Sequence, residues 1–155
     1  MRRAVLFPGA LLALASSVIH AATFRVGSDG APACTHSTLQ AAIAAALADP
    51  GPDTIIAPRS GSYTQQALVI NTDQVLTITG GYSNCITDFG DGEYTNIDGG
   101  GGSAQSTFRI TGGASSVINL RFLRIRNGDP SIFDGNGGNI NYDGAGVLEI
   151  GDAAI

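Results

Sequence analysis

Apolar and polar residues alternate with a period of two in a series of short segments, a pattern that predicts half-buried β-strands. The clearest example is residues 117–128, VINLRFLRIRNG, where apolar side chains occupy positions 118, 120 and 122 and then, in the opposite phase, positions 123 and 125. A shift by one residue turns the apolar set of a strand to its other face. This stretch therefore predicts two short strands that meet at a corner.

Similar segments recur along the chain, each with isoleucine two residues after another apolar residue and glycine shortly after it. The phrases VLTITGG, TFRITGG and VLEIGD begin at positions 75, 107 and 147, and the pairs Phe108 and Ile140, and Ile118 and Leu148, are about 30 positions apart. Short strands repeated at such an interval predict a solenoid of stacked turns. A first strand is expected at 23–26, a triplet at 54–57, 67–70 and 75–79, a separate strand at 95–98, a second triplet at 107–110, 117–120 and 123–126, and a third triplet beginning at 139–142 and 147–150.

One amphipathic helix is predicted before most of these strands, at residues 38–48. Leu39, Ile43 and Leu47 fall on one face of it. Ser37, with Gln40 three residues later, fits a capping box, and the Asp-Pro-Gly-Pro sequence at 49–52 ends the helix. Because a solenoid needs a terminal cap, we expect this helix to cover the N-terminal end of the strand stack and to bury those three apolar side chains.

Three strands per turn, joined by irregular loops, are typical of a β-helix. The segments TLQAAIAAALADPGPDTIIAP from position 38, LTITGGYSNC, TNIDGGG, INLRFLRIRNG and GNGGNINYDGAGVLEI resemble the opening of secreted bacterial right-handed parallel β-helix proteins. These include the pectate-lyase-like superfamily and outer-membrane and adhesin-like repeat proteins. The resemblance covers residues 23–155 and implies an all-β, single-stranded right-handed parallel β-helix with one N-terminal capping helix. Lyases, glycosidases, adhesins and inert stalks share this fold, so it does not select an activity.

Composition agrees with short strands joined by many turns. The chain has 155 residues, of which 43% are hydrophobic, 14% are charged and 22 are glycine. It contains no lysine, and its formal net charge is −5. An acidic chain of this kind is not expected to bind nucleic acid.

Residues 1–21 are predicted to be a secretory signal peptide. Two arginines are followed by the apolar run 4–15 and by small residues up to Ala22, which is the order of a signal peptide and its cleavage site. A membrane anchor is the alternative, but the run is shorter than the roughly 20 residues that a span needs. Cleavage after Ala21 or Ala22 leaves six arginines against 13 acidic residues, a net charge of −7. Residues 22–155 then form the mature β-helical part, which is expected to be secreted or displayed at the cell surface of a bacterium.

Cys34 and Cys85 are the two cysteines of the chain. An even number of cysteines in an exported protein favours a disulfide over two free thiols. Closing a loop of roughly 50 residues contributes about 4 kcal/mol in the chain-entropy model. We expect this bridge to hold the cap against the loop that follows residue 81.

Four arginines alternate with apolar residues and are expected on outer faces of the strands: Arg109, Arg121, Arg124 and Arg126. The guanidinium fork matches carboxylate and phosphate groups, so a stripe of them can hold an anionic polysaccharide or a lipid head group. The alternative is a solvated face on which these arginines pair with nearby acids.

Polysaccharide-cleaving enzymes use clustered carboxylates, either paired acids or ligands of Ca²⁺ beside a basic residue. The candidates are Asp98, Asp129, Asp134 and Asp143, each of which also fits ordinary turn chemistry beside glycine. No calcium-binding loop pattern surrounds them, and a calcium-stabilised module remains a weaker alternative. His36, alone among histidines after position 22, is expected to be a loop residue. We assign no catalytic, cofactor-binding or metal-binding residue.

The leading hypothesis is an exported β-helical repeat protein with a structural or adhesin-like surface role and a cell-surface glycan or polysaccharide as partner. The alternative is the N-terminal part of a secreted polysaccharide lyase or glycosidase whose active site lies on later turns. Residues 147–155 continue in strand pattern without a polar cap. We therefore expect either a longer β-helix or self-association through an open C-terminal edge.

Overall fold

The computed structural model describes residues 20–27, 33–87, 90, 92–101, 106–129 and 138–152. In this part the chain forms ten strands and one α-helix. The bounds are β1 Thr23–Arg25, α1 Leu39–Ala48, β2 Asp53–Ile56, β3 Leu68–Asn71, β4 Val75–Thr79, β5 Thr95–Asp98, β6 Phe108–Gly112, β7 Val117–Arg121, β8 Leu123–Arg126, β9 Ile140–Gly144 and β10 Val147–Gly151.

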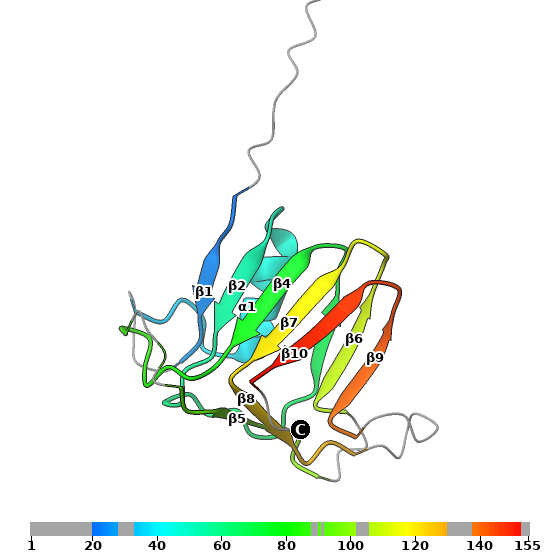
Figure 1. Cartoon of the computed structure of the whole chain (residues 1–155). Coiled ribbons are helices and arrows are strands. Elements are labelled where there is room, and N and C mark those ends of the chain that lie inside the picture. The colour runs from blue at the N-terminus through cyan, green and yellow to red at the C-terminus, as the bar shows by residue number, and fades with distance from the viewer. Residues whose placement is uncertain are drawn as a thin grey trace, which may run out of the picture.

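The strands build three sheets in which every pairing is parallel (Figure 1). The sheets have the orders β1-β2-β4-β7-β10, β3-β6-β9 and β5-β8. The chain visits the three sheets in turn, so that β4, β5 and β6 form one coil and β7, β8 and β9 form the next. Each strand then pairs with its counterpart one coil away, which confirms the predicted parallel β-helix.

The predicted corner lies at Phe122, between β7 and β8. Its backbone has φ 51°, in the left-handed region, and this single residue reverses the phase of the alternating pattern. Phe122 therefore sits at the bend, half-buried, and is not the last inward residue of a strand. Gly80 and Gly81 make room beside it, because a Cβ at Gly80 would lie 2.3 Å from the Phe122 carbonyl oxygen.

Buried side chains stack in columns along the coil. In the long sheet, Ile55, Ile78, Leu120 and Ile150 are in register, with Phe24 of β1 before them. The first three of these are fully buried, whereas Ile150 is 41% exposed. Among the described residues, β10 is the edge strand of this sheet.

The expected spacing is confirmed for the last two coils, where Phe108 pairs with Ile140 and Ile118 pairs with Leu148. The expected grouping of the earlier strands was wrong. The strand β5 belongs to a sheet with β8 and forms the middle strand of its coil. The preceding coil, which contains β2 and β3, has no strand at the corresponding position, where residues 57–67 run as a loop.

The helix α1 covers the N-terminal end of the stack and contacts β1, β2 and β3. Leu39 and Ile43 are buried as expected, and Leu47 packs against the core while half-buried. The helix begins one residue later than a Ser37 cap implies. Its N-cap is Thr38, whose hydroxyl accepts a hydrogen bond from the Ala41 N–H.

The predicted capping box does not form, because both polar groups of the Gln40 side chain bind the strand β3. Its Oε1 accepts from the Val69 N–H at 2.9 Å, and its Nε2 donates to the Val69 carbonyl at 3.4 Å. Since β3 is the edge strand of its sheet, this side chain satisfies peptide groups that a further strand would otherwise bind.

The disulfide Cys34–Cys85 is present, as predicted, with both cysteines buried. It joins the segment before α1 to the loop after β4. Gly27 lies directly beneath the bridge, since a Cβ there would come within 2.8 Å of the Cys34 Sγ and 3.2 Å of the Cys85 Sγ. The bridge therefore ties the cap to the second coil and requires glycine at position 27.

Candidate functional site

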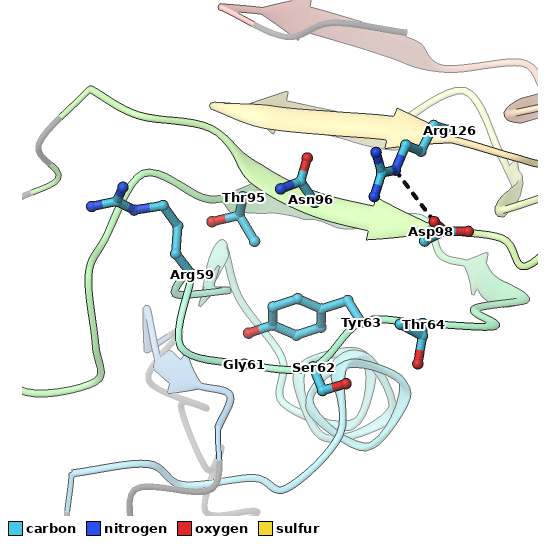
Figure 2. Close-up of a pocket in the computed structure, with 9 residues that line it drawn as sticks. All are labelled: Arg59, Gly61, Ser62, Tyr63, Thr64, Thr95, Asn96, Asp98 and Arg126. Carbon is cyan, nitrogen blue, oxygen red and sulfur yellow. Dashed lines mark ion pairs between the residues drawn. The ribbon is translucent and has the colours of Figure 1, made fainter.

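A polar groove runs along β5, on the side of the coil that faces the loop after β2. Its volume is about 310 Å³. The groove has one guanidinium group at each end, from Arg59 and Arg126, as Figure 2 shows. The residues lining it are Arg59, Gly61, Ser62, Tyr63, Thr64, Thr95, Asn96, Asp98 and Arg126.

The groove exists because the coil that contains β2 and β3, the first coil of the stack, has a loop where the next coils have a middle strand. The loop nevertheless follows β5 closely at one point, where the Asp98 N–H donates to the Tyr63 carbonyl and the Gln66 N–H donates to the Asp98 carbonyl, both at 2.8 Å. Tyr63 is buried, and its hydroxyl donates to the Val26 carbonyl at 3.2 Å. This anchor holds the inner end of the loop, while Ser62 and Thr64 on either side are exposed.

Gly61 allows the tyrosine to fold back beneath the loop. A Cβ at this position would lie 2.3 Å from the Tyr63 hydroxyl oxygen and 2.4 Å from the ring carbon that carries it. Any side chain would therefore displace the tyrosine ring and the groove wall with it.

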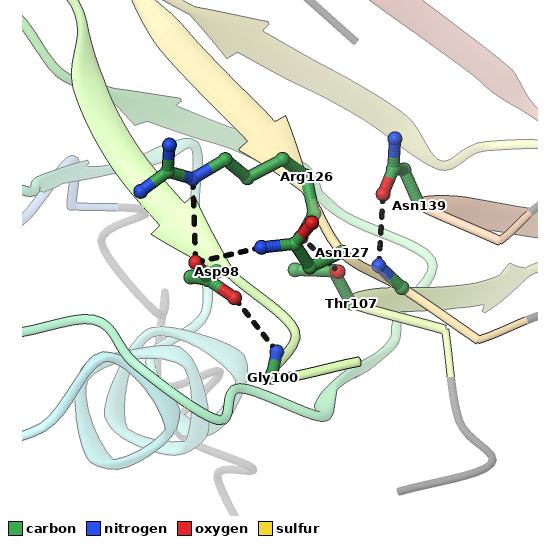
Figure 3. Close-up of polar contacts among 7 residues, drawn as sticks. Asp98, Gly100, Thr107, Arg126, Asn127 and Asn139 are labelled. Atoms are coloured by element: carbon green, nitrogen blue, oxygen red, sulfur yellow. Dashed lines mark hydrogen bonds and ion pairs between the residues drawn. The ribbon is translucent and has the colours of Figure 1, made fainter. Parts of the chain in front are cut away.

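Asp98 closes one end of the groove and is held by three donors (Figure 3). Its Oδ1 accepts from the Gly100 N–H at 2.8 Å, and its Oδ2 accepts from the Asn127 amide at 3.0 Å and from the Arg126 Nε at 3.3 Å. The hydrogen bond from Gly100 lowers the pKa of Asp98 most, followed by the Asn127 amide and then by the Arg126 charge; partial desolvation opposes them. The carboxylate thus stays ionised and links two successive coils.

The four arginines predicted on outer faces are all exposed. They do not form one stripe, because Arg109 lies in β6 and Arg121 in β7, on different sheets from the other two. Arg124 and Arg126 share the outer face of β8. Arg124 lies over the Tyr94 ring, with its Cζ 5.6 Å from the ring centroid, a cation–π arrangement.

The four candidate carboxylates are not brought together as a group. Asp98 lies in β5, Asp143 is exposed on β9 in another sheet, and Asp129 follows β8. Asp134 lies outside the described residues. Within the described part of the chain, no three His, Cys, Asp or Glu side chains are placed to hold a metal ion.

His36 belongs to the cap and not to the groove. It forms a parallel bridge with Val26, its ring contacts the Phe24 ring edge-on at 5.5 Å, and its Nδ1 lies 2.9 Å from the Thr35 hydroxyl oxygen. These contacts agree with the loop position expected for it.

Sequence reasoning missed the groove itself. Its wall, residues 59–64, gave no strand pattern and was expected to be a plain turn. The signal that could have drawn attention to it is the absence of a middle strand between the segments 54–57 and 67–70. Other coils have a strand at this point, so the loop there has to run over the face of the next coil.

No protein-family model matches the chain, and no curated protein or solved structure matches it at a significant level. Among the described residues no helix is long and apolar enough to cross a membrane.

Proposed function

We propose that this protein is an exported, non-catalytic β-helical module that binds an acidic polysaccharide in the groove along β5. This function fits a structural or adhesin-like role at the cell surface. Export is supported by the signal-peptide pattern of residues 1–21 and by the buried disulfide Cys34–Cys85, because such bonds persist in oxidising compartments. The parallel β-helix supports the resemblance to secreted β-helix proteins at the level of fold.

The observation that carries the ligand class is the placement of Arg59 and Arg126 at opposite ends of one groove (Figure 2). The exposed side chains of Ser62, Thr64 and Asn96 also line the groove and offer hydroxyl and amide groups. Sugar hydroxyls pair with such groups, and guanidinium forks match uronate carboxylates. The net charge of −7 that remains after signal-peptide cleavage opposes this only weakly, because salt screens charges beyond about 8 Å at physiological ionic strength.

Binding without cleavage is supported by the carboxylates of the groove. Asp98 is the one acid among the described lining residues, and its oxygens accept three hydrogen bonds. Glycosidases of either stereochemistry use two carboxyl groups, one of which starts out protonated. A single ionised and fully engaged carboxylate suits a role in holding the groove wall.

Affinity electrophoresis in gels containing polygalacturonate tests this proposal, with gels containing neutral dextran as the reference. We expect retardation by polygalacturonate alone, and we expect Arg59→Gln to reduce it severalfold. Arg109→Gln is the matched control, because it removes the same charge from an exposed position on another sheet. Equal retardation of both variants would contradict the groove as the binding site. Release of unsaturated or reducing ends from polygalacturonate would contradict the non-catalytic role.

A further inference from the structure

Asp53 is a buried carboxylate with one oxygen that has no partner. It is the first residue of β2 and is 2% exposed. Its Oδ1 accepts a hydrogen bond from the Ala22 N–H at 2.9 Å, whereas its buried Oδ2 has no hydrogen-bond partner. Burying a carboxylate oxygen without a hydrogen-bond partner costs free energy of folding. We therefore expect a further hydrogen-bond donor to bind Oδ2.

The register of the long sheet makes this aspartate unusual. Asp53 pairs with Leu76, which pairs with Ile118, which in turn pairs with Leu148. An acid therefore occupies a position that aliphatic side chains hold in each of the next three coils. An aliphatic side chain would suffice if this position only packed against the next coil. An acidic side chain is expected here if it binds a cationic group.

Ala22 is the residue placed to supply that partner. It is half-buried, and its carbonyl accepts the Thr54 N–H at 2.9 Å, which holds it beside β2. It also lies at the end of the predicted signal peptide, where cleavage after Ala21 or after Ala22 fits the small residues equally well.

We propose that signal peptidase cuts between Ala21 and Ala22, and that the new α-ammonium group of Ala22 forms a buried ion pair with Asp53. This inference rests on the proposed export of the protein. In the cleavage, water adds across the peptide bond. The Ala21 carbonyl carbon takes the hydroxyl and becomes a carboxylate, and the Ala22 nitrogen takes hydrogen and is protonated by solvent.

The product explains both oxygens of Asp53. An ammonium group has three donors where the amide had one, so it can keep the bond to Oδ1 and offer a second to Oδ2. The charge also makes these bonds stronger than those of a neutral amide. Cleavage after Ala22 would instead remove the donor that Asp53 has and leave a buried charge without its partner, which is strongly destabilising.

Sequencing the N-terminus of the exported protein tests the cleavage position. The full chain is expressed in a bacterial host that exports it, and the mature protein is examined by N-terminal sequencing and intact mass. We expect a chain beginning at Ala22. A chain beginning at Thr23 would overturn this inference alone, whereas full-length precursor retained in the cytoplasm would overturn the premise of export.

The ion pair can be tested separately, because the chain contains no lysine. The α-amino group is therefore the one primary amine of the mature protein, and an amine-reactive ester labels nothing else of that kind. We expect labelling of the native protein to be about tenfold slower than in guanidinium, since the carboxylate favours the unreactive protonated form. Equal native and denatured rates would overturn the ion pair.

Two variants assign this protection to Asp53. Asp53→Asn should bring labelling close to the denatured rate, whereas Asp143→Asn, which removes an exposed charge on β9, should leave it slow. If Asp53→Asn does not fold, the melting temperatures of the Ala22 chain, its N-acetylated form and the Thr23 chain replace that comparison. The Ala22 chain with a free amine should melt highest, and equal melting temperatures would overturn the proposal.

Discussion

The Gln40 side-chain amide forms both hydrogen bonds of a strand neighbour with the Val69 peptide, at 2.9 Å to its N–H and 3.4 Å to its carbonyl. One residue of the capping helix thus takes the place of a missing β-strand at the edge of the three-stranded sheet. The helix α1 therefore covers the apolar end of the stack and also supplies hydrogen bonds to the peptide groups of the edge strand β3. This pairing limits further growth of that sheet at the N-terminal end.

Replacing Gln40 by Met should remove both hydrogen bonds and keep the length and helix propensity of the side chain. We expect a loss of about 1 kcal/mol, because water replaces part of the bonding at this exposed site. Urea unfolding of both proteins measures the difference. Gln40→Glu is the companion variant, which retains the acceptor and loses the donor. A Met variant as stable as the wild type would show that the edge pairing does not contribute.

Replacing Ile43 by Asp should destabilise the protein by several kcal/mol, because a charge would enter a fully buried site under the cap. Ala44→Asp is the matched control, since it places the same charge on the exposed side of the same helix. Thermal unfolding followed by circular dichroism compares the three proteins. Equal melting temperatures for the two variants would contradict the role of α1 as the cap.

The disulfide should be complete in the exported protein. Thiol titration of the unreduced, denatured chain should detect no free thiol, and reduction should cost up to about 4 kcal/mol by the chain-entropy model. Gly27→Ala should lower the melting temperature of the oxidised protein, because its Cβ would press on both sulfur atoms. Two titratable thiols per chain would contradict the bridge.

Asp98 should make stability depend on pH in the acid range. The folded state lowers the pKa of this carboxyl below its ordinary value of 3.8. Its contribution is therefore present above pH 4 and is lost as the pH falls through the folded pKa. Melting temperatures of wild type and Asp98→Asn should differ near pH 6 and converge at the lowest pH at which both fold. A difference that stays constant with pH would contradict this role, and Asp143→Asn serves as the charge control.

The end of the stack formed by β10 should mediate self-association. Ile150 of β10 lies in register with the buried Leu120 but is itself 41% exposed, and the opposite end of the stack is covered by α1. A second copy can therefore pair its own β10 end with this one but cannot stack on the capped end. Sedimentation equilibrium should show a mass that rises with concentration, and Ile150→Arg should suppress the rise. The control variant Ile86→Arg, at a loop residue that is 71% exposed, should leave the rise in mass unchanged. A monomer at all concentrations would contradict the prediction.

The sequence by itself determined the features that local patterns or simple counts encode. Alternation marked the strands, the change of phase marked the corner at Phe122, and the helical spacing marked α1 with Leu39 and Ile43 inward. Two cysteines admit one intramolecular pairing, Cys34 with Cys85. These predictions succeeded because each depends on neighbours along the chain or on a unique combination.

Only the tertiary structure decided which distant residues meet, because the number of residues per coil is not constant. In the long sheet, Asp53 pairs with Leu76, Val75 with Val117 and Val117 with Val147, so the spacing changes with the length of each loop. The contacts of Asp98 with Asn127 and of Ala22 with Asp53 follow from the register of stacked coils, whereas the contact of Gln40 with Val69 follows from the packing of α1 on β3. The sequence does not distinguish a polar turn residue that faces water from one that faces the next coil. The stacking of the coils determines which partner such a side chain contacts.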